Sequence, residues 1–340
     1  MAQARTTDEI LDRILPVMPR KEWIDGLRAM AMLFVIFGHQ ISGFTPFYVF
    51  TGPIMIPLFF MITGYVFKDS NTSIPGFFRN LFFRLIIPWF FLTIPTAAQA
   101  ALSRGISALP GIYLKLVTGV EKWYMPCLVV AEILWFFIRR YARREALTCA
   151  CALAAFALGI ATMGVRVFNI AMVNRALLMQ LFMLMGFLFR TREERLVKIG
   201  GIWAAVLCAA YVAMVAVSLA IWPGRSLDVH LNRYYSLPYC FAMMILGCFT
   251  AFLCARKLAR APRVLRFIGQ NTLVYYLLHA ANIVALKAAL AVAGIALRES
   301  LASAVIKTLF ACVGCWLEAM ILNRFFPEAV GRKRRRTARP

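Results

Sequence analysis

Ten apolar runs of roughly 20 residues recur along this chain and are separated by short charged clusters. A bilayer-spanning helix needs about 20 mostly apolar residues. Lipid offers no partners to exposed backbone groups, so only helices and closed barrels cross it. The pattern predicts an all-α, polytopic membrane protein, a bundle of about ten transmembrane helices. The expected spans are 24–44, 49–67, 81–101, 124–138, 146–165, 167–189, 199–222, 237–255, 267–290 and 301–322.

The composition supports the same class of protein. Hydrophobic residues make up 62% of the 340 residues and charged residues 16%, whereas soluble domains average roughly 45–50% and 25%. A water-soluble enzyme is therefore excluded. The expected organisation is a cytoplasmic or interfacial segment over 1–22, a transmembrane domain over 23–323 and a basic cytoplasmic tail over 324–340. Any chemistry must then use the spans and short loops.

The formal net charge of +23 is unevenly distributed along the chain. The two tails and alternate loops hold 27 of the 38 Lys and Arg residues, the opposite loops hold eight, and three lie inside spans. Because Lys and Arg concentrate in cytoplasmic loops, both termini are predicted to be cytoplasmic. Anionic membrane lipids are the expected partners of this charge, and no nucleic-acid partner is expected.

The first span contains Arg28 and His39, eleven residues apart. A charged group in the bilayer centre costs at least about 2.5 kcal/mol, so such residues suggest function or pairing. At helical pitch the two side chains share one face and lie about 16 Å apart along the axis. This favours a polar passage along the helix. Alternatively, Arg28 pairs with Asp25, and His39 bonds a carbonyl of a neighbouring helix.

A second polar stripe occurs in the ninth span. Asn271, Tyr275, His279 and Asn282 follow at spacings of four, four and three residues, which places them on one face of a helix. We expect this face to line a polar passage. Glu132 in the fourth span is expected to orient either histidine, or else to pair with Arg28 or Lys307.

Several ordered motifs resemble the integral-membrane acyltransferase 3 family. The first motif is Glu22, Asp25, Gly26, Leu27 and Arg28 followed by His39, and the second is the run 59–65, in which Thr63 stands where the family more often has Ser. Basic residues before Pro88 and the stretch 269–279 continue the likeness. Trp123 and Tyr124, followed by Leu128 and Glu132, resemble the fucose 4-O-acetylase-like branch.

The resemblance implies a membrane O-acyltransferase in a cell inner membrane. It would move an acyl group, usually acetyl from acetyl-CoA, to a hydroxyl of a glycan or lipid-linked sugar. His39 would act as the base or carry the acyl group, and His279 would handle protons. Arg28, Arg79 and Arg84 would hold the CoA phosphates, although positive-inside bias explains Arg79 and Arg84 equally well.

The acceptor is expected to bind at the other end of the passage. Trp123 and Tyr124 offer flat faces for a sugar ring, or else they anchor the helix at the membrane interface. Glu132, Asn271 and Tyr275 are further candidates for contact with the substrate. The polar cluster over 228–235 is an expected vestibule.

Two other interpretations stay open. The bundle could export a polysaccharide or sugar intermediate, although repeats and midplane carboxylates typical of transporters are not evident. It could also be a structural partner in polysaccharide assembly. No metal is expected, because Cys312 and Cys315 have no second ligand pair and suit packing better.

Overall fold

The computed structural model describes residues 21–41, 45–67, 73–295 and 300–332. Over these residues the chain is helical and contains no strands, apart from one isolated bridge between Asp228 and Arg233. The all-α prediction is therefore confirmed for the described residues. Most of the predicted N-terminal segment and the end of the basic tail lie outside them.

The helices follow one another with short connections. Their bounds are α2 (Glu22–Gly38), α3 (Thr45–Met55), α4 (Pro57–Val66), α5 (Ile74–Leu81), α6 (Ile87–Arg104), α7 (Leu109–Thr118), α8 (Tyr124–Tyr141), α9 (Glu145–Ala161), α10 (Val173–Thr191), α11 (Glu193–Val197), α12 (Gly201–Ile221), α13 (Leu237–Leu258), α14 (Arg263–Gln270), α15 (Thr272–Val292) and α16 (Leu301–Phe325).

Each of the ten predicted spans contains a helix, but four of them are interrupted. The run 167–189 begins in a 3₁₀ segment with left-handed backbone at Ala171 and Met172 before α10 starts. The run 49–67 breaks between α3 and α4 at Ile56, because Pro57 begins a new helix. The run 81–101 starts in a single π-helical turn, Phe82–Ile86. The run 267–290 breaks at Asn271, so its span is α15 alone.

Seven described segments are long and apolar enough to cross a membrane. Among the predicted spans, α2 and α9 are shorter than this, and α8 is more charged at its end. The polytopic membrane class is thus confirmed. The seven segments are Pro46–Val66, Ile74–Arg104, Arg166–Thr191, Gly201–Ile221, Leu237–Leu258, Thr272–Val292 and Leu301–Phe325.

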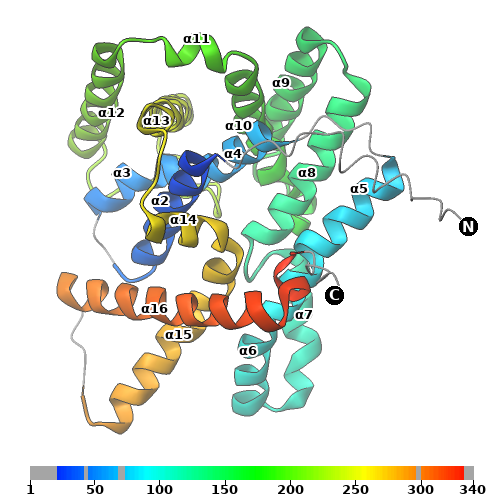
Figure 1. Ribbon diagram of the computed structural model, residues 1–340, viewed down its shortest axis with the longest axis vertical. Helices are drawn as coiled ribbons and strands as arrows, with labels where there is room; N and C mark the ends of the chain where they lie inside the picture. The colour runs from blue at the N-terminus through cyan, green and yellow to red at the C-terminus, as the bar shows by residue number, and fades with distance from the viewer. Residues whose placement is uncertain (1–20, 42–44, 68–72, 296–299, 333–340) are drawn as a thin grey trace, which may run out of the picture.

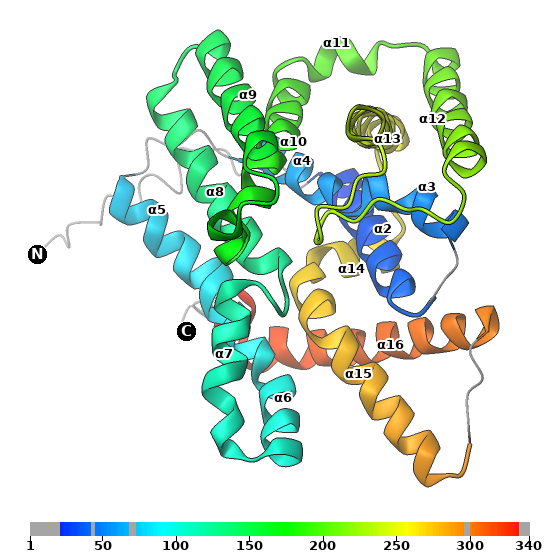
Figure 2. The same cartoon turned by 180° about the vertical axis from the view of Figure 1, so that it is seen from behind.

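Helix α2, which carries Arg28 and leads to His39, lies at the centre of the bundle. It contacts α3, α4, α13, α14, α15 and α16. Figures 1 and 2 show α13 nearly end-on between α10 and α12, while α6, α7 and α15 form the opposite part and α16 crosses α15. Both ends of α2 are therefore fixed by several neighbours.

Small residues allow two helices to approach closely. A Cβ atom added at Gly64 of α4 would lie 2.0 Å from the Met183 carbonyl oxygen, and one added at Gly186 of α10 would lie 1.9 Å from that of Met61. Such contacts between small residues drive helix association in lipid, where the hydrophobic effect is absent. The α4–α10 pair therefore forms a tight unit behind α2.

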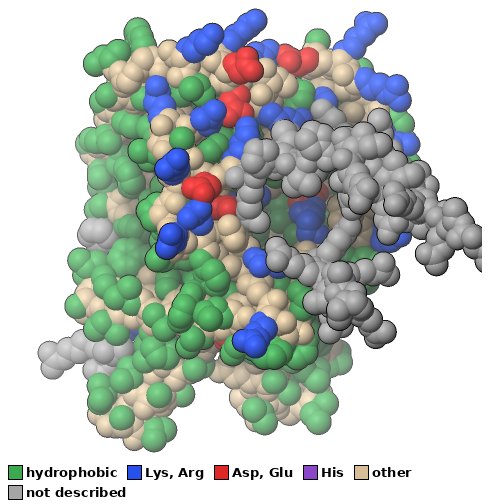
Figure 3. Space-filling model, in the orientation of Figure 1, with side chains coloured by type: hydrophobic (Ala, Val, Ile, Leu, Met, Phe, Trp, Pro, Cys, Tyr) green, Lys and Arg blue, Asp and Glu red, His purple; other side chains and the backbone are tan. Residues whose placement is uncertain are grey.

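Contacts between connections join several of the loops that the charge pattern assigns to the cytoplasmic side. Glu193 after α10 receives hydrogen bonds from Lys21 before α2 and from Arg256 at the end of α13. Arg192 pairs with Glu145, again between segments that the charge pattern assigns to one side of the membrane. We call the side that carries Lys21, Glu145, Arg192, Glu193 and Arg256 the basic face. Figure 3 shows clustered Lys, Arg and acidic side chains at the centre and upper edge of the view.

Candidate active site

The structure brings His39 and His279 together. His39 caps the end of α2, where its backbone N–H donates to the Val35 carbonyl, and His279 lies on α15. The two rings stack with centroids 5.4 Å apart and 19° between their planes. His279 is only 4% exposed, and its Nδ1 lies 2.9 Å from the Tyr275 carbonyl oxygen. That contact fixes the ring orientation of His279.

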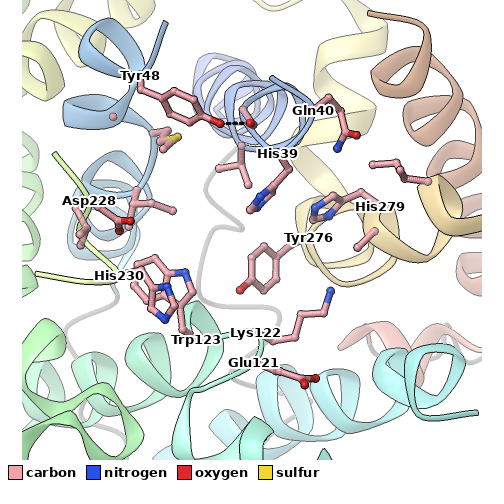
Figure 4. Close-up of a pocket in the computed structure, with 18 of the residues that line it drawn as sticks. His39, Gln40, Tyr48, Glu121, Lys122, Trp123, Asp228, His230, Tyr276 and His279 are labelled. Carbon is pink, nitrogen blue, oxygen red and sulfur yellow. Dashed lines mark hydrogen bonds between the residues drawn. The ribbon is translucent and has the colours of Figure 1, made fainter. Parts of the chain in front are cut away.

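A cavity of about 800 Å³ surrounds these rings. We call it the histidine cavity, because all three histidines of the chain, His39, His230 and His279, line it. Its walls come from the end of α2, from α3 and α15, and from the loops 119–123 and 222–236. Figure 4 shows the polar side chains that converge there: Gln40, Tyr48, Glu121, Lys122, Trp123, Asp228 and Tyr276 join the histidines.

The loop that carries His230 is anchored to the bundle. Arg175 of α10 donates to the His230 carbonyl from Nε at 3.0 Å and from a terminal nitrogen at 2.7 Å. Asn232 donates to the buried Asn174 at 2.6 Å. As a result the His230 ring stacks on Trp123, with centroids 5.0 Å apart and planes 13° apart.

His230 sits outside the spans, and its surroundings favour the neutral ring. Burial lowers the pKa of His230, and Arg175 acts in the same direction, whereas Asp228 opposes them. A neutral imidazole can both donate and accept a hydrogen bond. Together, Trp123 and His230 form an aromatic wall with polar edges, which suits a sugar ring.

A second cavity, of about 140 Å³, lies further along α2. Arg28, Arg84, Tyr124 and Glu132 line it, and we call it the arginine cavity. Arg28 lies 3.9 Å from Asp25. Arg84, in the π-helical turn, forms a two-pronged ion pair with the buried Glu132, with one nitrogen–oxygen distance of 3.2 Å.

The two cavities lie end to end. Val35, Ile56 and Tyr276 line both of them and so form the wall between them. Tyr276 also contacts Tyr124 on one side, with ring centroids 5.3 Å apart, and His279 on the other, at 6.5 Å. Arg28 therefore opens into one cavity and His39 into the next, as expected from their shared face of α2.

Three predicted site residues lie outside both cavities. Arg79 is exposed on α5. Asn271 and Tyr275 are buried, and Asn271 accepts a hydrogen bond from Asn323 of α16 at 2.8 Å. Asn282, which belongs to the same predicted stripe, donates to Glu318 of α16 at 2.9 Å.

Of the predicted polar stripe, only His279 lines one of the two cavities. Asn271 precedes α15 and has non-helical backbone angles. A spacing of four residues therefore does not place Asn271 on the same helix face as Tyr275. The expectation that Glu132 orients a histidine is also not met, because Arg84 engages both carboxylate oxygens. The alternative expectation was that Glu132 forms an ion pair with Arg28 or Lys307. Glu132 does form an ion pair, but with Arg84.

Trp123 and Tyr124 are separated by the wall. Trp123 lines the histidine cavity, whereas Tyr124 lines the arginine cavity and packs on Phe59 and Phe60. Only Trp123 is therefore placed beside the three histidines. In the described part of the chain no group of three or more His, Cys, Asp or Glu residues is placed to hold a metal ion.

Lys122 and Tyr276 were not singled out as site residues from the sequence. His230 belongs to the polar cluster 228–235 that was expected to form a vestibule, and it lines the histidine cavity. Tyr276 gave no signal in the sequence, since an aromatic residue in an apolar helix is ordinarily part of the core.

A bundle of apolar helices that encloses two polar cavities end to end defines an integral-membrane protein with an internal site. The family model described as an acyltransferase domain, that of the acyltransferase 3 family, matches residues 21–320. The chain belongs to this family and is a membrane O-acyltransferase. Comparison with curated proteins and with solved structures finds no match. The fucose 4-O-acetylase-like resemblance stays a prediction.

Proposed function

We propose that this protein transfers an acetyl group from cytoplasmic acetyl-CoA to a hydroxyl of a cell-envelope or secreted glycan, or of a lipid-linked sugar, in a cell inner membrane. One observation carries the proposal. The arginine and histidine cavities meet at a shared wall, with Arg28 in one and His39 in the other. A charged donor and a sugar acceptor can thus approach one another from opposite ends.

The donor enters the arginine cavity from the basic face. Arg28 and Arg84 offer fixed positive charge and forked donors, which suit phosphate. Glu132 engages both prongs of Arg84, whereas Arg28 lies 3.9 Å from Asp25, so we assign the donor contact mainly to Arg28. The donor phosphates then meet Arg28, the pantetheine arm runs through the cavity of about 140 Å³ toward the shared wall, and the nucleoside stays outside.

The acceptor occupies the histidine cavity. Trp123 and His230 provide the wall against which a sugar ring stacks, and a hydroxyl then points toward His39 and His279. An imidazole titrates near neutrality, so His39 can accept the hydroxyl proton as the oxygen attacks the thioester. His279, fixed by the Tyr275 carbonyl, stacks on His39 and orients it.

The test is transfer of labelled acetyl groups by purified protein in lipid nanodiscs. With radiolabelled acetyl-CoA and a glycan extract we expect labelled sugar from the wild type. A general base contributes about 10²–10⁴ in rate, so His39→Ala should lose at least about 100-fold. Gln99→Ala, which truncates an exposed polar side chain of α6 that lines neither cavity, is the control and should stay within a few-fold of the wild type.

Each outcome separates the alternatives. Near-normal transfer by His39→Ala would remove the proposed mechanism. An exporter would give no labelled sugar with the wild type. Label that stays on acid-quenched protein in the absence of acceptor would show that His39 carries the acyl group instead of acting as the base.

A further inference from the structure

Lys122 is held in an unusual backbone conformation at the edge of the histidine cavity. Its φ angle is +51°, in the left-handed region that side-chain-bearing residues rarely adopt. The loop is fixed on both sides: the Glu121 N–H donates to the Lys115 carbonyl at 3.1 Å, and the Met125 N–H donates to the Lys122 carbonyl at 3.0 Å. Strained residues of this kind cluster at functional sites.

This conformation directs the side chain inward. The Nζ of Lys122 donates to the Leu277 carbonyl oxygen at 3.2 Å, two residues before His279 on α15. Figure 4 shows the amine extending from the loop toward His279 and His39. Because an ammonium group carries three N–H donors, the bond to Leu277 fixes its position and leaves donors for a substrate.

We propose that Lys122 is a catalytic residue that stabilises the oxyanion of the transfer reaction, an inference that rests on the proposed function. The acceptor oxygen forms a bond to the thioester carbon, and the hydroxyl proton passes to His39. The carbonyl electron pair moves onto oxygen, and the Lys122 ammonium donates to that oxyanion. The carbonyl then re-forms, the C–S bond breaks with its electron pair on sulfur, and the thiolate takes the proton from His39.

The groups around Lys122 determine how readily its amine loses a proton. The acidic groups that face it are Glu121 beside it, Asp228 from the loop 222–236 and the Cys315 thiol of α16. The basic groups are His39, His230, His279 and Lys287, and the phenols are Tyr48 and Tyr276. Burial lowers the pKa of Lys122, whereas Glu121 and Cys315 raise it, and burial prevails.

Lys115 is the matched comparison, because it is an exposed lysine on α7, seven residues before Lys122, and lines neither cavity. Lys115→Met removes one lysine charge from the same part of the chain without changing a residue of either cavity. It therefore serves as the matched control for Lys122→Met.

The experiment measures kcat, the KM for acetyl-CoA and the pH profile of kcat for the wild type, Lys122→Met, Lys122→Arg and Lys115→Met. Removal of one oxyanion donor costs about 10²–10³ in kcat, so we expect that loss in Lys122→Met with the KM changed less than threefold. Lys115→Met should keep at least half of the wild-type kcat. In the wild type, kcat should fall on the alkaline side as Lys122 loses its proton.

Lys122→Arg keeps the cation at all accessible pH values. We expect it to retain more activity than Lys122→Met and to lack the alkaline fall. A kcat of Lys122→Met within threefold of the wild type, or an unchanged alkaline fall in Lys122→Arg, would overturn the assignment. Size-exclusion profiles in detergent confirm folding, and Lys122→Arg carries the test if Lys122→Met does not fold.

Failure of this inference can be told apart from failure of the proposed function. If the wild type transfers acetyl and His39→Ala does not, the proposed function stands whatever Lys122 does. As a readout independent of activity, ¹³C-methylated lysines can be titrated by NMR, with the signal assigned by its loss in Lys122→Arg. An ordinary lysine pKa at position 122 would contradict the expected alkaline fall.

Discussion

Arg28 lines the arginine cavity, where Arg84 is engaged by both carboxylate oxygens of Glu132, so under the proposed function Arg28 is the main contact for the donor. A hydrogen bond to a charged group contributes about 1.5–3 kcal/mol, which corresponds to roughly 10–100-fold in affinity. We therefore expect Arg28→Ala to raise the KM for acetyl-CoA by at least about tenfold and the KM for the acceptor far less. Steady-state kinetics with each substrate varied in turn will show this.

Arg79→Ala is the comparison, because Arg79 is exposed and lines neither cavity. Its KM for acetyl-CoA should stay within about twofold of the wild type, since loss of one surface charge has a small effect. An unchanged donor KM in Arg28→Ala would assign that arginine a structural role with Asp25.

Glu193 joins three helices on the basic face. It accepts hydrogen bonds from Lys21 at 2.6 Å, from Tyr65 and from Arg256. Burial raises the pKa of Glu193, but the hydrogen bonds from these three donors lower it by more. The pKa of Glu193 is therefore below its ordinary value. A carboxylate with a lowered pKa stabilises the fold above its ordinary pKa, and the contribution is lost as the pH falls through the lowered value.

We expect Glu193→Gln to lose about 1–3 kcal/mol of stability at pH 7. The difference from the wild type should begin to shrink as the pH falls below the ordinary Glu value of about 4.3 and should vanish as the pH passes the lowered pKa of Glu193. Thermal unfolding in detergent between pH 3.5 and 7.5 measures both effects. Glu194→Gln, an exposed neighbour, should unfold like the wild type at each pH; a pH-independent Glu193→Gln penalty would contradict the argument.

Some site residues were predictable because they share a single helix. Arg28 and His39 lie on one continuous helix, so their spacing alone placed them correctly. The Arg84–Glu132 pair was not predictable, because the sequence does not show which cation lies near a given carboxylate in space. Asn271 lines neither cavity, because the helical spacing was extended across the break before α15, whereas Tyr275 lies in α15 with His279 and packs into the core.

Among the elements, the α4–α10 contact depends on two glycines. A Cβ at Gly186 would meet the Met61 carbonyl oxygen at 1.9 Å, so backbone must move to admit any side chain. We expect Gly186→Leu to abolish or strongly reduce the folded protein, with a loss of at least about 3 kcal/mol. Fluorescence-detected size exclusion of a tagged variant measures the folded fraction.

Gly201→Leu is the matched control, because a Cβ there meets nothing within 4 Å. It should fold with a wild-type profile. If Gly186→Leu also folded normally, the close approach of α4 and α10 would be wrong. Loss of folding in both variants would point instead to a general intolerance of bulk in this bundle.

Helix positions were predictable, but the interruptions inside them were not. Apolar runs marked all ten helical regions, because lipid imposes the same requirement on each. The break at Ile56 and the π-helical turn at Phe82–Ile86 depend on packing, and nothing in an apolar run distinguishes them. Pro57 does not by itself show whether the run 49–67 forms one helix or two, since Pro is also common in the first turn of a helix.

For the whole molecule, the sorting of loops makes a prediction about sidedness. Lys198 and Arg225 are exposed and flank α12, which is long and apolar enough to span the membrane. We expect Lys198→Cys to react with an impermeant thiol reagent from the cytoplasmic side and Arg225→Cys from the opposite side. Labelling in sealed vesicles of both orientations, with the modified peptides identified by mass, measures this.

Reaction of both cysteines from one side would contradict the assigned topology. Reaction from opposite sides in the reversed order would keep the two groups of loops and reverse their assignment. The charge pattern predicted which loops share a side because Lys and Arg are retained in the cytoplasm during insertion. It could not predict that those loops also touch one another.

The unequal sizes of the two cavities have a consequence for selectivity. The arginine cavity measures about 140 Å³ and the histidine cavity about 800 Å³. Under the proposed function, every acyl group passes the narrow cavity before it reaches His39, so bulky or branched thioesters are refused. The wide cavity is bounded in part by the loop 222–236, and loops vary more readily than the elements they connect. Sequence changes in that loop then alter which glycan is accepted, while His39, Lys122 and His279 deliver the same small group.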